Sequence, residues 1–176
     1  VYSHQAAIVR LEAEVNDKQP VFTEELKKKR PDLVSSEKAL FKTRAIKMES
    51  KVNVLTKQLE QKQQELLELK SIKDRLANNL PLIKEELKIP EPIVKAGATS
   101  KMELLKLQRE YNDLRWEYKK VGLGIPRLRS AIEEAKQKIN AEYQGFKADA
   151  QREMNERKTK MVSLQESITA ISDKVT

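Results

Sequence analysis

The stretch KIPEPIVKAGATSKME, residues 88–103, is the one place where two very long heptad runs are clearly separated. Pro90 and Pro92 lack the amide hydrogens that a helix needs, and each disfavours helical backbone in the residue before it. Gly97 supplies the backbone freedom that a chain reversal needs. Ser100, with a glutamate three residues later, fits a capping box and predicts that a second helix begins there. We therefore predict that this stretch is the tip of a helical hairpin.

Apolar residues repeat at alternating spacings of three and four on both sides of the tip, as they do in a coiled coil. The first run starts at Phe41 and departs from the apolar pattern only at Lys62 and Lys73. The second run has no polar core position from Leu104 to Ile139, and after that its phase moves by a stutter. Two long helices that pack along a common apolar seam are the prediction.

Proline and glycine interrupt both runs without changing their phase. Pro81 lies in the first run, where we expect a kinked helix, with a broken helix as the alternative. Gly122, Gly124 and Pro126 lie in the second run, where the unchanged phase favours a kinked, continuous helix over a domain boundary.

The N-terminal region follows the same spacing from Val1 to Val15, which predicts a short first helix. Thr23 is a candidate cap for a helical turn in the connection that follows, and Asp32 or Ser35 is a candidate cap for the next helix. Pairing the two long arms about the tip occupies the return arm to about residue 150. We therefore expect the first helix to lie against Met161 to Val175.

These patterns predict an all-α fold. It is a long antiparallel coiled-coil hairpin with a short N-terminal helix packed on the C-terminal end of the return helix. We expect one domain over residues 1–176, with helix 1 at 1–17, a connecting loop at 18–33, helix 2 at 34–87, the tip at 88–100 and helix 3 at 101–175.

The composition is typical of solvated helices rather than of a globular core. Charged residues make up 35% of the 176 residues and aromatic residues 5%, and the formal net charge is +8. That charge permits binding to nucleic acid or anionic lipid, but basic and acidic residues alternate at helical spacing, as on coiled-coil flanks. The one basic cluster, Lys27 to Arg30, is either a solvated loop or a docking patch for an acidic surface. No apolar window is long enough to span a membrane, and there is no cysteine.

Candidate chemistry is sparse in this sequence. His4 is the single histidine and occupies a seam position, which favours a helix interface over a metal ligand. Trp116 and Tyr118 are interpreted as packing residues, with nucleic-acid stacking as the alternative. Residues 122–124 match only the first half of a dinucleotide fingerprint and lack its strand. We therefore expect no enzyme activity, no cofactor and no metal.

An ordered series of landmarks runs through the chain. They are Pro20-Val21-Phe22, Pro31-Asp32-Leu33-Val34, the segment Ile93 to Ser100, and Ile125-Pro126-Arg127. Together they resemble the membrane fusion proteins of type I secretion, the hemolysin D family. The segment Ile93 to Ser100 is the most specific part of the resemblance.

The resemblance implies a periplasmic adaptor that bridges an inner-membrane ABC transporter and a TolC-like outer-membrane channel for protein export. It implies that this chain is the hairpin segment, that the full-length protein is anchored in the inner membrane of a Gram-negative bacterium, and that copies self-associate into a ring, expected to be a hexamer. The transporter would be bound through domains outside this segment. No nucleic acid and no small-molecule substrate are expected as partners.

The resemblance also implies that the tip binds the outer-membrane channel. Related efflux adaptors carry an arginine, leucine and serine motif there: Ser100 matches the serine, Ile93 stands at the leucine position, and Ile89 replaces the arginine. Ser100 keeps its interpretation as a helix cap beside this one. The expected partner-binding residues are Ile93, Val94, Lys95, Gly97, Ala98, Thr99 and Ser100.

A different class of function also fits the charge and the periodicity. A cytoplasmic coiled-coil scaffold, or a rod associated with nucleic acid, would have the same heptads and the same +8 charge. Salt-dependent binding to duplex DNA would support that alternative.

Overall fold

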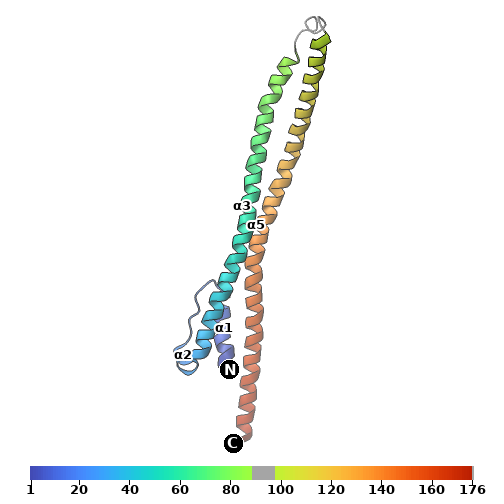
Figure 1. Cartoon of the computed structure of the whole chain (residues 1–176). Coiled ribbons are helices and arrows are strands. Elements are labelled where there is room, and N and C mark those ends of the chain that lie inside the picture. Colours follow the sequence, from blue (N-terminus) through green and yellow to red (C-terminus); the bar gives the residue numbers. More distant parts are fainter. Residues whose placement is uncertain (89–97, 176) are drawn as a thin grey trace. The chain divides into compact units, whose positions relative to one another are not determined.

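The computed structural model describes residues 1–88 and 98–175. These residues form α1 (Tyr2–Val15), α2 (Glu24–Lys29), α3 (Pro31–Glu86) and α5 (Ala98–Val175), and no strand occurs among them (Figure 1). This confirms the predicted all-α fold with its long hairpin. The chain divides into two compact units. We call Val1–Leu55 with Gln137–Thr176 the terminal unit and Thr56–Lys136 the hairpin unit. The prediction of one domain stays a prediction.

The hairpin unit is a two-helix antiparallel coiled coil of α3 and α5. Its core is a cluster of Leu76, Val121 and Ile125, which are 1%, 8% and 7% exposed. Half-buried apolar side chains from both helices pack against this cluster; they are Leu66, Leu69, Ile72, Leu114 and Tyr118. All but Ile72 lie on the two heptad seams predicted from the sequence. The period of the apolar residues therefore determines which faces of the helices meet.

Two departures from an ideal seam have a packing reason. The ammonium group of Lys73 lies 5.7 Å from the ring centroid of Tyr118, so this lysine contributes a cation–π contact where an apolar residue was expected. A Cβ atom added at Gly124 would lie 3.2 Å from Leu69 Cδ2. The glycine therefore lets the two helices approach closely at that level.

Neither proline inside the long runs ends its helix. Pro81 lies within α3 and Pro126 within α5, and both helices continue on either side. The alternative of a broken helix at Pro81 is therefore wrong. The continuous seam supplies the contacts that keep the helix intact where an amide hydrogen is missing. A kink at either proline stays a prediction.

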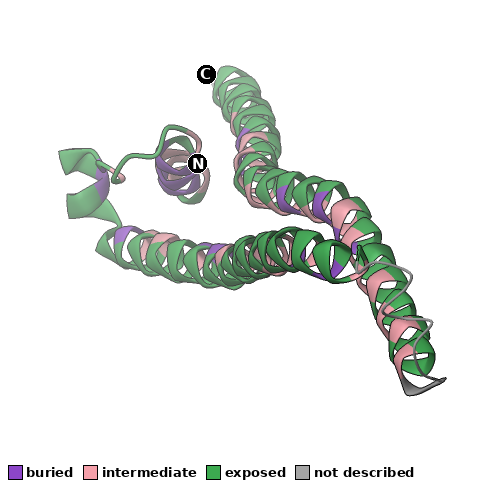
Figure 2. Cartoon of the chain, turned by 90° about the horizontal axis from the view of Figure 1, so that it is seen from above, coloured by how far each residue is buried: buried purple, intermediate pink, exposed green. Residues whose placement is uncertain are grey.

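The terminal unit is a bundle of three helices rather than two. Ala6 packs in a cluster with Val34 of α3, and Leu11 packs in another with Ala150 and Met154 of α5. Residue numbers increase together in the contacts of α1 with α3, from Arg10–Glu37 to Glu14–Arg44, so these two helices are parallel. They change in opposite directions in the contacts with α5, from His4–Arg157 to Asp17–Lys147, so α1 and α5 are antiparallel. Figure 2 shows buried residues on α1 and an exposed C-terminal end of α5.

The predicted position of α1 on the return helix is wrong. We expected α1 against Met161 to Val175, but it contacts α5 between Lys147, which pairs with Asp17, and Arg157, which lies beside His4. The physical reason is that α1 packs beside the N-terminal part of α3, rather than on the part of α5 that extends past α3. It is buried against α3 and α5 together, and its small alanines at 6, 7 and 13 permit that close approach.

The connection between α1 and α3 contains α2. Thr23 is its N-cap, and the Thr23 side chain accepts a hydrogen bond from the Leu26 amide at 3.3 Å, as predicted. Leu26 is 3% exposed and packs with Phe22 against α1. Its apolar anchor thus holds this short helix on the bundle.

The predicted start of the second helix is also wrong. Neither Asp32 nor Ser35 caps α3, because the helix already begins at Pro31. Proline is well suited to the first helical position, since its fixed φ is helical and the missing amide hydrogen has no partner there. Hydrogen bonds from Arg30 flank the turn and lower the pKa of Asp32 to about 2.

Candidate functional site

The partner-binding residues expected at the tip fall at the border of the described chain. Ile93, Val94, Lys95 and Gly97 lie outside the described residues, as does Ile89. Ala98 and Thr99 are the first two residues of α5, and Ser100 follows as its third residue, half-buried. Of the seven predicted residues, three are therefore placed at the N-terminal end of α5.

Ser100 is not the cap that the sequence predicted. The helix α5 begins at Ala98, so Ser100 lies inside its first turn rather than before it. The capping-box pattern identified the right region but put the start of the helix too late. Alanine has the highest helix propensity, so Ala98 favours a helix that begins two residues before Ser100.

The chain leaves α3 through a defined final turn. The amides of Leu87 and Lys88 donate to the carbonyls of Ile83 and Glu85, at 3.0 and 3.1 Å. The Lys88 ammonium pairs with the Glu85 carboxylate at 3.1 Å. Since Ile83 is 9% exposed, the apolar seam of the hairpin unit reaches to the end of this helix.

An ion-pair network joins the three helices of the terminal unit. Arg10 of α1 pairs with Glu14 on its own helix at 2.9 Å, with Glu37 of α3, and with Glu153 of α5 at 3.4 Å. Arg44 of α3 donates to the same Glu14 oxygen, Oε1, at 3.0 Å. One guanidinium group of α1 thus connects all three helices.

The centre of this network is almost completely buried. Arg10 is 2% and Glu14 is 3% exposed. Burial acts to lower the pKa of Arg10, but hydrogen bonds to Glu37 and Glu14 outweigh it and raise that pKa above its ordinary value. The second oxygen of Glu14, Oε2, is buried and has no hydrogen-bond partner in the part of the chain that the structure describes.

Sequence reasoning missed this network. It assigned α1 a single apolar seam of Val1, His4, Ile8, Leu11 and Val15, and treated charged residues as solvated. The available signal was the spacing of four between Arg10 and Glu14 in a helix with three alanines. Such a pair is also common on exposed helices, so the spacing alone does not predict burial.

His4 is a helix-interface residue, as the sequence predicted. Its Nδ1 atom lies 3.4 Å from Nη1 of Arg157 on α5. Burial lowers the pKa of His4, and the positive charge of Arg157 lowers it further. Within residues 1–88 and 98–175, no three metal-binding side chains come together.

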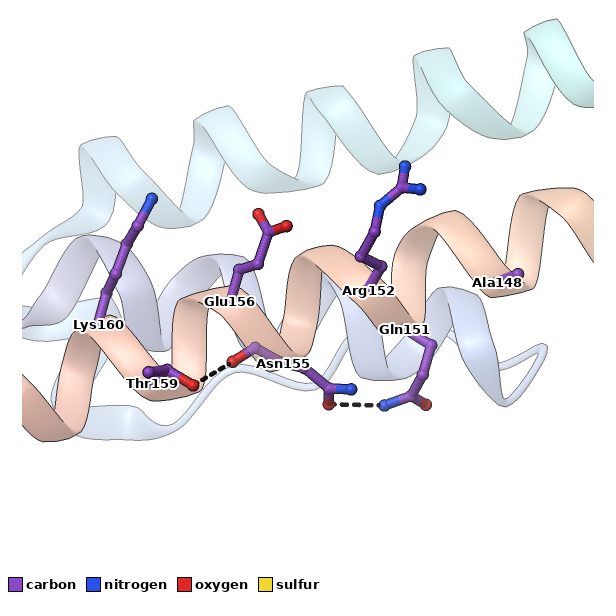
Figure 3. A pocket seen from close by; sticks show the side chains of 7 residues that line it. All are labelled: Ala148, Gln151, Arg152, Asn155, Glu156, Thr159 and Lys160. Carbon is purple, nitrogen blue, oxygen red and sulfur yellow. Dashed lines mark hydrogen bonds between the residues drawn. The ribbon is translucent and has the colours of Figure 1, made fainter.

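An open hollow lies along α5 (Figure 3). It has a volume of about 660 Å³ and is lined only by α5 residues, namely Ala148, Gln151, Arg152, Asn155, Glu156, Thr159 and Lys160. Gln151 donates to the Asn155 side chain at 3.0 Å, and Thr159 donates to the Asn155 carbonyl at 3.0 Å. Figure 3 shows Arg152 and Glu156 pointing away from Gln151 and Asn155, so the polar groups do not converge.

Of the two aromatic residues expected to pack, Tyr118 does and Trp116 does not. Tyr118 packs against the core of the hairpin unit, whereas Trp116 is 69% exposed. The prediction for Trp116 is therefore wrong. It lies beside the seam in the sequence, but none of the described helices of the hairpin unit covers that flank.

None of the described helices combines the length and the apolar character needed to cross a membrane.

Comparisons with known proteins place this architecture. The sequence matches the family described as AprE, long alpha-helical hairpin, over residues 1–174. No curated protein matches it. The fold is similar to the crystal structure of the soluble domain of LipC, a membrane fusion protein of a type I secretion system. The TM-score is 0.83 at 14% identity, covering 98% of this chain and 84% of that one. Because the family match extends over almost all of its residues, this chain belongs to the AprE family of long alpha-helical hairpins.

Proposed function

We propose that this chain is the helical hairpin of a membrane fusion protein that acts as an adaptor in a type I secretion system. The observation that carries the proposal is the family match over residues 1–174. The fold shared with the soluble domain of LipC, itself a membrane fusion protein of such a system, supports it. The match does not favour a cytoplasmic scaffold or a rod bound to nucleic acid.

The physical properties of the hairpin suit a spacer. The helix α5 has 78 residues, a helical contour of about 115 Å at 1.5 Å per residue. Apolar side chains such as Leu76 and Ile125 are buried between the arms, and the ion pairs of the hairpin unit lie at its surface. A long helical pair that stabilises itself can bridge a distance without a globular core.

The partners of the proposed adaptor follow from its place in the pathway. An ABC transporter in the inner membrane would supply the exported protein, and a TolC-like outer-membrane channel would receive it. The hairpin would stand in the periplasm between them, with copies arranged as a ring, expected to be a hexamer. Neither enzyme activity nor a cofactor is part of this role.

The role as a spacer predicts that length is essential. Deleting residues 77–83 and 108–114 together removes one heptad from each arm and shortens the pair by about 10 Å. The contacts of Leu69 with Gly124 and of Lys73 with Tyr118 match residues of the two arms at equal levels, so the double deletion keeps the seam in phase. Secretion in cells that contain the transporter and channel should be lost, while helix content and cooperative melting persist.

A matched control keeps the length and changes the same segments. Replacing Asn78, Asn79, Gln108 and Asn112 with alanine alters four exposed polar residues and should leave secretion normal. If the shortened protein is folded, reaches normal levels and still secretes at the normal rate, the chain is not a spacer between two membranes.

The tip residues remain the proposed docking surface for the outer-membrane channel. From the sequence, prolines at 90 and 92 disfavour regular helix around Ile93, so we expect its side chain and backbone groups to be available to a partner. Replacing Gly97 with tryptophan should reduce secretion strongly and leave helix content nearly unchanged, because small residues there permit a close approach. The matched control is Leu82→Trp, at a position that is 63% exposed on α3. Normal secretion with tryptophan at both Ile93 and Gly97 would exclude the tip as the docking surface.

A further inference from the structure

Glycine and proline are concentrated in one short segment of α5, inside the hairpin unit. Residues 121–127 have the sequence VGLGIPR, so two glycines and a proline fall within seven residues of a helix that continues from Ala98 to Val175. Within a helix, glycine is less favourable than alanine, and proline is far less favourable still. No other run of seven described residues holds both glycine and proline.

Gly122 and Pro126 are four residues apart, and this spacing couples their effects. Proline has no amide hydrogen, so the Gly122 carbonyl lacks the helical hydrogen bond that residue 126 would otherwise donate. The proline ring also crowds the carbonyl of the residue four positions earlier. Because that residue is glycine, its peptide group can turn outward toward water without a clash from a Cβ atom. The two residues therefore weaken the same turn of the helix.

Packing accounts for only one of the two glycines. A Cβ atom added at Gly124 would lie 3.2 Å from Leu69 Cδ2, so a larger residue there would press on α3. A Cβ atom added at Gly122 would meet no atom within 4 Å. Space does not require glycine at position 122, and its physical effect is therefore on the backbone.

The apolar seam holds this segment on its inner side. Val121 and Ile125 are 8% and 7% exposed and pack with Leu76 of α3, whereas Leu123 between them is 64% exposed. The inner face of the segment is therefore fixed by side-chain packing. The weakened backbone hydrogen bonding is a separate property of the same turns.

The weak segment of α5 lies opposite a regular part of α3. The contacts of Leu69 with Gly124 and of Lys73 with Tyr118 put residues 65–71 of α3 at about the same level. These seven residues include neither glycine nor proline. The weakness at this level is therefore confined to one arm of the hairpin.

We propose that residues 121–127 are a hinge in the return arm of the hairpin. The backbone of α5 opens there locally, while the packing of Val121 and Ile125 on α3 keeps the two arms in register. The regular helix of α3 curves gently at the same level. The part of the hairpin unit on the tip side of the hinge thereby tilts without separation of the arms.

Only the use of this motion rests on the adaptor role. In an adaptor, the tilt lets the tip follow the surface of its partner while the apolar seam stays closed. The tests below read the motion and not secretion, so a failure of the hinge is distinct from a failure of the adaptor role.

Hydrogen exchange of single amides in the 176-residue chain tests the local opening. Protection of the amides of residues 123–125 and 127 should be at least about tenfold lower than that of the α3 amides at the same level. Gly122→Ala should raise this protection by about fivefold, because alanine favours the helix and its Cβ atom has room. Pro126→Ala should raise it further, since alanine restores the missing amide hydrogen.

Gly145→Ala is the matched control. Gly145 also lies in α5, and a Cβ atom added there likewise meets nothing within 4 Å, so the change has the same effect on helix propensity within the terminal unit. It should leave the protection of the hinge amides unchanged. An equal gain from Gly122→Ala and Gly145→Ala would mean that α5 opens as a whole, which overturns the proposal. Hinge amides as well protected as the α3 amides beside them would overturn it too.

Residual dipolar couplings of the α5 amides test the tilt itself. In a rigid arm, residues 104–118 and 128–136 share one alignment in a dilute aligning medium, whereas a hinge between them gives the two segments different degrees of alignment. The combined variant Gly122→Ala/Pro126→Ala should bring both segments to a common alignment, and Gly145→Ala should leave the difference unchanged. A common alignment in the unaltered chain would show a rigid arm and overturn the proposal.

Discussion

Replacing Arg10 with alanine should lower the free energy of unfolding of the terminal unit by about 3–5 kcal/mol. The guanidinium group is the common partner of Glu14, Glu37 and Glu153, and its removal leaves those carboxylates with Arg44 and Arg157 as the remaining cations. Glu14 is only 3% exposed and already has one oxygen without a partner. Glu14 then keeps only Arg44 as a cation, and a buried carboxylate that loses one of its two counter-ions retains its desolvation cost with less compensation.

The measurement is chemical denaturation followed by circular dichroism, with hydrogen exchange of α1 to assign the loss to that helix. Arg152→Ala is the matched control, because Arg152 is 72% exposed and pairs with Asp149 three residues earlier at 3.0 Å. It should change stability by no more than about 0.5 kcal/mol. Arg10→Lys should fall between the two, since lysine keeps the charge but not the planar fork. Equal effects of Arg10→Ala and Arg152→Ala would contradict a structural role for the network.

The network also explains the limit of sequence reasoning for this fold. A heptad pattern identifies one apolar face of a helix. In the hairpin unit, α3 and α5 each bury a single face, and it is the face that the pattern identifies. The seam residues Leu76, Val121 and Ile125 were therefore predicted correctly, and the prolines did not mislead because the phase continued past them. In a two-helix coiled coil, the periodicity alone determines the packing.

The terminal unit was predicted less well because its packing depends on three helices at once. The residues of α1 face two partners, so Arg10 and Glu14, which lie off the expected seam, are buried against α3. The predicted position of α1 assumed that each segment of α5 has one mate at a time. The spacing of apolar residues in α1 fits two arrangements equally well. In one, α1 packs on the part of α5 that extends past α3; in the other, it packs against α3 and α5 together.

The helix boundaries illustrate competition between local signals. Asp32, Ser35 and Ser100 are all good cap residues, but α3 begins at Pro31 and α5 at Ala98. A cap contributes about 1 kcal/mol, which neighbouring helical residues can outweigh. The proposed docking role of the tip depends on the surface of a partner, so helix propensity does not predict it. The exposed Trp116 likewise has no counterpart in the seam pattern.

Replacing Leu76 with alanine should destabilise the hairpin unit by about 2–5 kcal/mol. Leu76 is 1% exposed and lies in the cluster formed with Val121 and Ile125. With only two helices, the unit has no second layer of side chains that could move in to fill the space that the leucine leaves. The loss therefore includes both the transfer of the buried side chain and the cavity that remains.

Leu82→Ala is the matched control for this prediction, since it removes the same atoms from the same helix at a position that is 63% exposed. It should change stability by no more than about 0.5 kcal/mol, as surface substitutions away from special features do. Hydrogen exchange of the α3 amides near residue 76 measures the local loss for both variants. The contrast tests the seam itself, because the two leucines differ only in the side of α3 on which they lie. If Leu82→Ala costs as much as Leu76→Ala, the hairpin unit buries a face other than the one described.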